Sequence, residues 1–264
     1  MAPSLFTAIF LLSFAFLPFH TYSSSFVASH LEADIGTSNQ SSFAPSDQKV
    51  NLSVYYESLC PACAQFIVQN LLTIFNNGLI DIVNLRLIPW GNARFIGMNN
   101  TIICQNGHEE CQLNTVQACS IDILHDVDKS YALISCMELF VIEGKHNSWH
   151  ECFESLGLSD QRIVDCYNSA NGTKLDVLLS QETSSLVPPP TFVPWIVVNK
   201  LSIGKDYGNF TVYVCNEYKG QPAPAACNSL PPQGSKVAVS NLDNLQACHK
   251  KEAMNLTSLD RLRE

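Results

Sequence analysis

Apolar and polar residues are patterned along the first part of the chain in a way that predicts a strand, a helix and a second strand. Residues 50–57 are rich in β-forming side chains, and apolar residues alternate with polar ones in 80–88. Residues 62–76 have apolar positions at helical spacing, and Asn77-Gly78 follows as a typical helix stop. This order predicts a βαβ unit with two parallel strands.

From about residue 105 to residue 186 the pattern is helical, and we expect an insertion of several helices there. The apolar residues that recur at helical spacing lie in 116–127, 131–142 and 163–167. A run of three prolines ends this region, and residues 195–198 form a short apolar strand. Asn199-Lys200 predicts a turn into a neighbouring strand at 201–203, and a last helix is expected over 209–218.

The first residues have the pattern of a targeting segment. Residues 5–17 are apolar and uncharged, and small polar residues follow, so we interpret 1–24 as a signal peptide and 25–48 as a disordered leader. An uncleaved membrane anchor is the alternative, although the run is short for a membrane span. The remaining chain divides into one domain, 49–230, and a C-terminal tail, 231–264.

Composition narrows the possible partners and compartments. The formal net charge is -9 and no basic run occurs, which argues against nucleic acid as a partner. No later segment predicts a membrane span. Eleven cysteines and six Asn-x-Ser/Thr sequons indicate the secretory pathway, with an endpoint outside the cell or in a vacuole or lysosome. We expect glycosylation at some of the sequons, namely Asn99, Asn171, Asn209 and Asn255.

The motif Cys60-Pro61-Ala62-Cys63 carries the candidate chemistry. It follows a strand and begins a helix, where unpaired N–H groups and the helix dipole stabilise a thiolate. Cysteines in such motifs have pKa values of roughly 3.5 to 7, against about 8.5 for a free thiol. We therefore predict Cys60 as the nucleophile at the exposed end of the helix. Cys63, one turn further on, is expected to resolve the mixed disulfide, so the two form the redox disulfide.

Two other interpretations of this motif stay open. It could be half of a zinc site, but no second pair of cysteines at this spacing and no His pair with ligand spacing accompany it, so we expect no metal. It could also form a purely structural disulfide. The position between a strand and a helix favours the redox interpretation.

Val193-Pro194 lies just before the apolar strand 195–198. In thioredoxin-like folds a cis proline stands at this place and faces the CxxC motif, so we expect Val193 and Pro194 to line the substrate groove. A trans proline at a strand start is the alternative. The predicted fold class is therefore α/β, with a thioredoxin-like core and a helical, disulfide-tied insertion.

Three segments resemble the gamma-interferon-inducible lysosomal thiol reductase (GILT) family, and its plant-type members in particular. The first is residues 56–63, and the second is residues 104–111, similar to the family signature Cys-Gln-His-Gly-x-x-Glu-Cys and followed by Asn114 and Cys119. The third is residues 193–195 with Cys215 and residues 218–220. Asn106 stands where the family has His, so a role of that imidazole does not carry over.

The resemblance implies reduction of protein disulfides, often at acidic pH, in endolysosomes or outside the cell. Disulfide-bonded proteins would be the substrates and small thiols the electron donors, with no cofactor. The sequence leaves open an oxidase or isomerase of the same fold. It also leaves open a protein of another class, a non-catalytic, disulfide-rich secreted binding protein.

The remaining cysteines are expected to be mainly structural. Eight of them are assigned to disulfides, namely Cys104, Cys111, Cys119, Cys136, Cys152, Cys166, Cys215 and Cys227. Close spacing favours the pairs 104–111, 152–166 and 215–227, with 119–136 next. Cys248 is then left over, either free or paired between chains. We expect Glu109 and Glu110 to be solvated or to stand at a helix start.

Overall fold

The computed structural model describes residues 49–97, 101–229 and 247–250. The expected signal peptide and leader, most of the expected tail, and the sequons at Asn99 and Asn255 lie outside these residues. Among the residues described, none of the helices combines the length and the apolar character that crossing a membrane requires.

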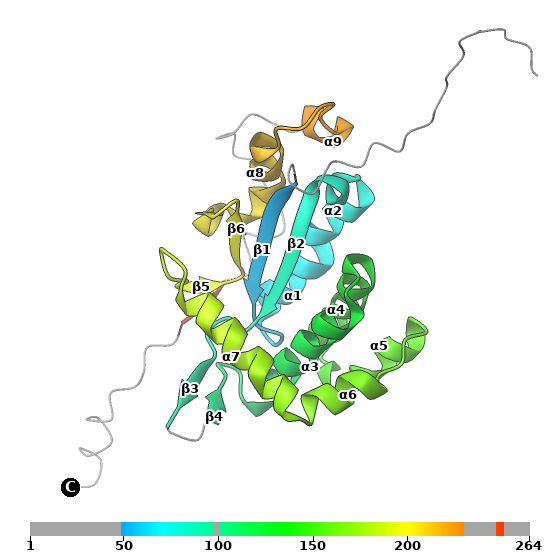
Figure 1. Cartoon of the computed structure of the whole chain (residues 1–264), viewed down its shortest axis with the longest axis vertical. Coiled ribbons are helices and arrows are strands. Elements are labelled where there is room, and N and C mark those ends of the chain that lie inside the picture. Colours follow the sequence, from blue (N-terminus) through cyan, green and yellow to red (C-terminus); the bar gives the residue numbers. More distant parts are fainter. Residues whose placement is uncertain (1–48, 98–100, 230–246, 251–264) are drawn as a thin grey trace, which may run out of the picture. The chain divides into compact units, whose positions relative to one another are not determined.

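A four-stranded sheet forms the centre of the fold, in the order β2 (Val83–Pro89), β1 (Val50–Tyr56), β6 (Trp195–Val198), β7 (Leu201–Ser202) (Figure 1). β1 runs parallel to β2 and antiparallel to β6, where Val54 pairs with Ile196. The predicted βαβ unit is confirmed. Segments on either side of the insertion therefore share one sheet, as a thioredoxin-like core requires.

Burial explains why these strands form. Val50 and Leu52 are buried on one face of β1, whereas Asn51 between them is exposed. All four residues of β6 are buried, as expected for an inner strand covered on both faces. Asn199 and Lys200 have φ angles of 45° and 72°, which suit the two-residue turn that joins β6 to β7, as predicted.

The predicted helix over 62–76 is present as three consecutive helical segments, α1 (Pro61–Gln65), a wider π-helical turn η2 (Phe66–Leu71), and α2 (Leu72–Asn76). Gly78 follows with φ of 77°, a conformation that favours glycine. The second strand begins later than predicted, because a 3₁₀ turn, η3 (Leu79–Ile82), precedes it. The small hairpin of β3 (Arg94–Ile96) and β4 (Thr101–Ile103) was not predicted.

The helical insertion is confirmed, and its elements are α3 (His108–Leu124), α4 (Val127–Ile142), η4 (His146–Ser148), α5 (His150–Ser155), α6 (Gln161–Tyr167) and α7 (Ala170–Ser184). Two of the helices begin at capping side chains, because Asp126 accepts a hydrogen bond from the N–H of Lys129 and Ser169 accepts one from the N–H of Asn171. The insertion has an apolar cluster of its own, which includes Leu133.

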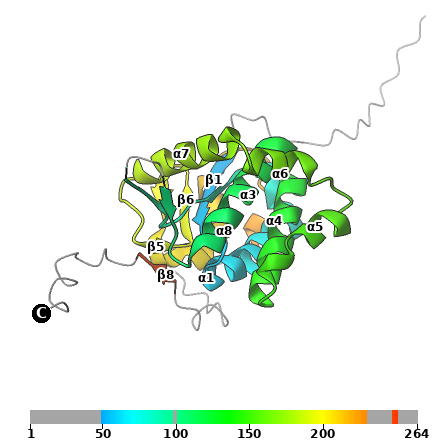
Figure 2. The same ribbon diagram turned by 90° about the horizontal axis from the view of Figure 1, so that it is seen from below.

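The chain returns to the core through β5 (Phe192–Val193), and after β7 it continues through η5 (Gly204–Asn209), α8 (Phe210–Glu217) and α9 (Ala225–Asn228). A last strand, β8 (Cys248–His249), pairs antiparallel with β5 (Figure 2). Residues 247–250 fall in the segment that the sequence assigned to the tail. The structure places these four residues against the core.

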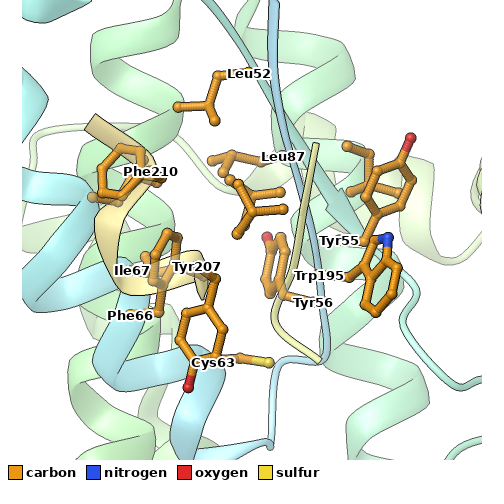
Figure 3. Close-up of a cluster of buried hydrophobic side chains, with 14 of the residues drawn as sticks. Leu52, Tyr55, Tyr56, Cys63, Phe66, Ile67, Leu87, Trp195, Tyr207 and Phe210 are labelled. Atoms are coloured by element: carbon orange, nitrogen blue, oxygen red, sulfur yellow. The ribbon is translucent and has the colours of Figure 1, made fainter. Parts of the chain in front are cut away.

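The main core encloses the motif. Phe66 and Ile67 lie on one side of β1 together with Phe210 of α8, whereas Tyr55 and Trp195 lie on the other side (Figure 3). Phe66 and Ile67 belong to the helix that continues from the motif, and with Phe210 they cover one face of the sheet. The start of that helix is thereby held at one end of β1.

Candidate active site

Cys60 lies at the junction of strand β1 and helix α1. It has an extended conformation and caps the helix, and Pro61 occupies the first helical position, where a missing N–H costs nothing. The loop before it turns tightly, since the N–H of Cys60 donates to the carbonyl of Glu57 at 3.3 Å. Cys60 therefore stands at the N-terminal end of the helix, a position that stabilises a thiolate.

Cys63 follows in the same helix and is fully buried, next to Tyr56 and Tyr207 in the core (Figure 3). Burial raises the pKa of its thiol well above the usual value. The negative charges of Glu57 and Glu138 also raise this pKa, although a backbone hydrogen bond with Glu57 lowers it. The Cys63 thiol is therefore held protonated, as suits a cysteine that acts second.

The structure corrects the expected pairing of these two cysteines. Cys60 is bonded to Cys248, with the two Cα atoms 6.2 Å apart, and Cys63 is a free thiol. The reason is the pairing of β8 with β5, which brings Cys248 to the start of α1. Cys60 is also fully buried, and not exposed as predicted.

The peptide bond between Val193 and Pro194 is cis, as the sequence predicted. It joins β5 to β6, and the carbonyl oxygen of Val193 lies 3.9 Å from the sulfur of Cys60. The two segments expected to form the site, about 130 residues apart in the chain, therefore meet at one sulfur atom.

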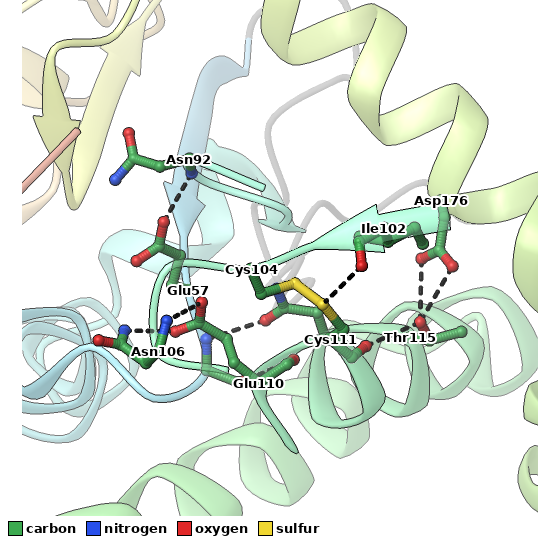
Figure 4. Close-up of a disulfide and its surroundings, with 11 residues drawn as sticks. Glu57, Asn92, Ile102, Cys104, Asn106, Glu110, Cys111, Thr115 and Asp176 are labelled. Atoms are coloured by element: carbon green, nitrogen blue, oxygen red, sulfur yellow. Dashed lines mark hydrogen bonds between the residues drawn. A yellow bond between two sulfur atoms is a disulfide. The ribbon is translucent and has the colours of Figure 1, made fainter. Parts of the chain in front are cut away.

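The segment 104–111 forms a loop closed by the Cys104–Cys111 disulfide, which confirms that prediction (Figure 4). Asn106 donates from its backbone N–H at 3.1 Å and from Nδ2 at 2.5 Å to the carboxylate of Glu110. Glu110 stands in the first turn of α3, which is one of the two placements expected for it, and it is fully buried rather than solvated. Burial raises the pKa of Glu110, and its hydrogen bonds with Asn106 lower it.

The same segment holds the loop that precedes Cys60. The N–H of Ser58 donates to Oδ1 of Asn114 at 2.9 Å, and its hydroxyl donates to the carbonyl of Glu110 at 3.3 Å. On the other side, Oε1 of Glu57 accepts a hydrogen bond from the N–H of Asn92 at 2.7 Å. The preceding Gly91 has φ of 56°, and a side chain there would collide with Glu57. These contacts fix the approach of the chain to Cys60.

Comparison with known proteins identifies the family. The family model "Gamma interferon inducible lysosomal thiol reductase (GILT)" matches residues 51–156. A "Gamma-interferon-responsive lysosomal thiol protein" from Arabidopsis thaliana is 37% identical over 185 residues, which are 69% of this chain and 76% of that protein. The chain belongs to the GILT family.

A second relative agrees with this membership. A "Gamma-interferon-inducible lysosomal thiol reductase" from Mus musculus is 34% identical over 197 residues, 73% of this chain and 77% of the relative. Among solved structures, the oxidoreductase DsbA from Xylella fastidiosa covers 66% of this chain and 89% of its own, with 19% identity and a TM-score of 0.44. The strand order β2, β1, β6, β7 gives the chain its thioredoxin-like core. As a GILT family member, the chain is a thiol–disulfide oxidoreductase.

Of the residues around the family motif, sequence reasoning missed Ser58 and Asn92. Ser58 stood inside the recognised segment 56–63, and only its place beside the cysteines could have drawn attention to it. Asn92 lies in a turn after β2 and carries no local signal. Each acts through a contact with a residue at least 35 positions away, so no short motif includes both partners.

The structural cysteines are partly paired as predicted. The Cys215–Cys227 disulfide is confirmed, and it joins α8 to α9. The expected pairs 152–166 and 119–136 were wrong, because Cys119 of α3 bonds to Cys166 of α6, and Cys136 of α4 bonds to Cys152 of α5. The packing of the helices determines which cysteines bond to each other. The shortest spacing along the chain does not predict these pairs.

Two of the expected glycosylation sites fall on described residues. Asn171 is exposed in the first turn of α7. Asn209 is half-buried just before α8, and its Nδ2 donates a hydrogen bond of 2.6 Å to Asp206. Their surroundings differ, and only Asn171 presents an exposed side chain in this structure.

Proposed function

We propose that this enzyme reduces disulfide bonds in protein substrates through Cys60 and Cys63. The thiolate of Cys60 attacks one sulfur of the substrate disulfide, forms a mixed disulfide, and releases the other substrate sulfur as a thiolate that takes up a proton. Cys63 then attacks the sulfur of Cys60. This second step breaks the mixed disulfide, frees the second substrate thiol and leaves a Cys60–Cys63 disulfide.

The observation that carries the proposal is the unequal placement of the two cysteines. Cys60 caps the helix beside Val193, whereas Cys63 is enclosed in the core. A sulfur at the helix end meets the substrate first, and an enclosed thiol can react only with the sulfur beside it. Val193 and Pro194 would line the groove that receives the substrate chain.

Small thiols would supply the electrons, because two of them suffice to return the Cys60–Cys63 disulfide to two thiols. Acidic conditions are part of the proposal. Support comes from buried carboxyl groups with raised pKa values, since Glu110 and Glu138 are fully buried and Asp176 has a pKa of about 6. Such groups favour the folded state where they are protonated.

The proposed compartment is the secretory pathway, ending outside the cell or in a vacuole or lysosome. Support comes from the cysteine count, the five disulfides of the described residues, and the word "lysosomal" in the names of the Arabidopsis and mouse relatives. Glycosylation at Asn171 is proposed with it.

Reduction of insulin disulfides by the purified full chain tests the function, at pH 5 and at pH 7, with dithiothreitol as the small thiol. We expect activity in the wild type and its loss in Cys60→Ser, with the greater activity at pH 5. The double variant Cys215→Ser/Cys227→Ser serves as a control, because it removes a disulfide that joins α8 and α9 only. Full activity of Cys60→Ser would refute the proposal, and so would inactivity of the fully reduced wild type.

A further inference from the structure

The chain's own segment 247–250 lies where the proposed function puts a substrate. Cys248 pairs with Val193 in the β5–β8 ladder, and Val193 is the residue before the cis proline. The N–H of Lys250 donates to the carbonyl of Thr191 at 3.1 Å. An extended segment added to a short strand in this way is a common mode of peptide binding.

The side chains around the segment strengthen this placement. Nδ2 of Asn92 donates to the carbonyl of Cys248 at 3.4 Å, and the same nitrogen lies 3.1 Å from Oε1 of Gln105. The ring of His249 lies against that of Phe192, with centroids 5.8 Å apart. The segment is therefore held by backbone pairing, a side-chain amide and an aromatic contact, in addition to its disulfide.

The sulfur of the proposed nucleophile, Cys60, is itself part of a disulfide. Cys60 is bonded to Cys248 and fully buried, so no substrate disulfide can reach its sulfur in this state. Cys63 remains a free thiol in the next turn of the same helix. The arrangement corresponds to the mixed disulfide of the proposed reaction. Cys248 takes the place of the substrate cysteine, and Cys63 is the free thiol that attacks next.

We infer that Cys248 is a third redox-active cysteine, and that residues 247–250 act as a tethered substrate that caps Cys60 in the oxidised enzyme. This inference rests on the proposed function. In the uncapping step, Cys63 attacks the sulfur of Cys60, the Cys60–Cys248 bond breaks and the Cys60–Cys63 bond forms. The proton of Cys63 passes to the departing sulfur of Cys248. One disulfide and one thiol are present before and after, so the step needs no external oxidant or reductant.

The reverse step caps the enzyme after a turnover, when Cys248 attacks Cys60 in the Cys60–Cys63 disulfide. Cys248 also competes with substrates for a mixed disulfide on Cys60, because a tethered thiol has a high effective concentration at the groove. Its attack on such a mixed disulfide forms the Cys60–Cys248 bond and releases the substrate thiol. The cap therefore protects the nucleophile and limits the lifetime of substrate adducts.

Peptide mapping of the oxidised full chain tests the bond. The protein is quenched in acid, alkylated with N-ethylmaleimide and digested without reduction. We expect a peptide pair linked through Cys60 and Cys248, with the alkyl group on Cys63. Absence of that linked pair would overturn the inference. So would a Cys60–Cys248 bond that resists dithiothreitol in the folded protein while the Cys63 thiol is unmodified, because the bond would then be structural only.

A trapping experiment tests the role of Cys248 and separates it from the proposed function. Reduced Cys63→Ser and Cys63→Ser/Cys248→Ser are mixed with insulin, and the covalent adducts are measured. If the cap displaces about 80% of the adducts, the double variant accumulates about fivefold more of them, since only the uncapped fraction retains substrate. Lys250→Ser in the Cys63→Ser background is the control. It keeps Cys248 and the backbone N–H of residue 250, so its adduct level should stay low.

The outcomes are distinguishable. Equal adduct levels in Cys63→Ser and the double variant would overturn the role of Cys248 and leave the proposed function intact. No adduct in either variant would refute Cys60 as nucleophile, and with it the inference. A rise in the Lys250→Ser control equal to that of the double variant would also overturn the inference, because the sulfur of Cys248 would then be irrelevant.

Discussion

The hydroxyl of Tyr56 donates a 2.7 Å hydrogen bond to Oε1 of Gln117, and both residues are fully buried. Nε2 of Gln117 in turn donates to Oε1 of Glu138, also at 2.7 Å. This chain of hydrogen bonds joins the central strand β1 to α3 and α4 of the insertion. Core and insertion are therefore connected by a buried polar network as well as by packing.

Breaking this network should destabilise the fold. Gln117→Leu removes the central side chain and leaves the hydroxyl of Tyr56 and the carboxyl group of Glu138 without these partners. Because unpaired buried polar groups cost about 1–3 kcal/mol each, we expect the free energy of unfolding to fall by about 3 kcal/mol. Urea denaturation measures the change. Gln161→Leu, at an exposed position of α6, is the control, and an equal effect of both would contradict the prediction.

Stability should depend on pH through Asp176. Burial raises the pKa of its carboxyl group from 3.8 to about 6, and Oγ1 of Thr115 lies 3.0 and 3.1 Å from its two oxygens. The folded state binds this proton more tightly than the unfolded state. The contribution of Asp176 is therefore fully present below about pH 4 and is lost as the pH rises to about 6, by at most about 1.4 kcal/mol per pH unit.

Asp176→Asn should flatten this dependence, because the amide does not titrate. The difference in unfolding free energy between wild type and variant, measured by denaturation at pH 4, 5, 6 and 7, should change between pH 4 and pH 6 and then level off. Asp122→Asn, on the exposed face of α3, should show no such change. A constant difference for Asp176→Asn across the series would show that the group does not titrate there.

The two cysteines of the motif should differ in their rate of alkylation. In the fully reduced protein at pH 5, we expect Cys60 to react with N-ethylmaleimide before Cys63, since burial raises the pKa of Cys63 and encloses its sulfur. Mass spectrometry of peptides taken at intervals gives the order. The unfolded chain, in which the order should vanish, is the control, and earlier labelling of Cys63 in the folded protein would reverse the assigned roles.

Loss of the Cys119–Cys166 disulfide should cost more than loss of Cys215–Cys227. The first closes a separation of 47 residues and the second one of 12. Loop-closure entropy gives about 4 kcal/mol for the former and about 3 kcal/mol for the latter. Thermal unfolding of the two double Cys→Ala variants tests the order, and a lower stability of the second variant would contradict it.

Glycosylation should favour Asn171 over Asn209. Asn171 is exposed, whereas Nδ2 of Asn209, the atom to which a glycan would attach, donates to Asp206. The two variants are expressed through a secretory pathway and compared on a gel before and after glycosidase treatment. The glycosidase-sensitive shift in mobility should be lost in Asn171→Gln and retained in Asn209→Gln. The reverse result would show that the glycosylated asparagine is selected before this local structure forms.

Much of the core could be predicted from the sequence, because its signals are local. The patterns of 50–57 and 195–198 predicted two strands. Asn199-Lys200 predicted the turn from the second of them into β7, since turn conformation depends on the residues that adopt it. The CxxC motif at the start of a helix, and a proline before the strand 195–198, are local signals as well. Together with the signature segment, they were enough to indicate the family.

The tertiary structure decided which distant residues meet. Cys248 belongs to a segment without a strong pattern, and only its pairing with Val193 brings it to Cys60. Glu110 was expected to be solvated or at a helix start, and it stands at the start of α3. Its burial was not evident, because that depends on how the loop that includes Asn106 packs against the chain before Cys60. Sequence specifies elements through interactions between near neighbours. Disulfide partners and buried polar contacts depend on which faces pack together, which short-range patterns do not contain.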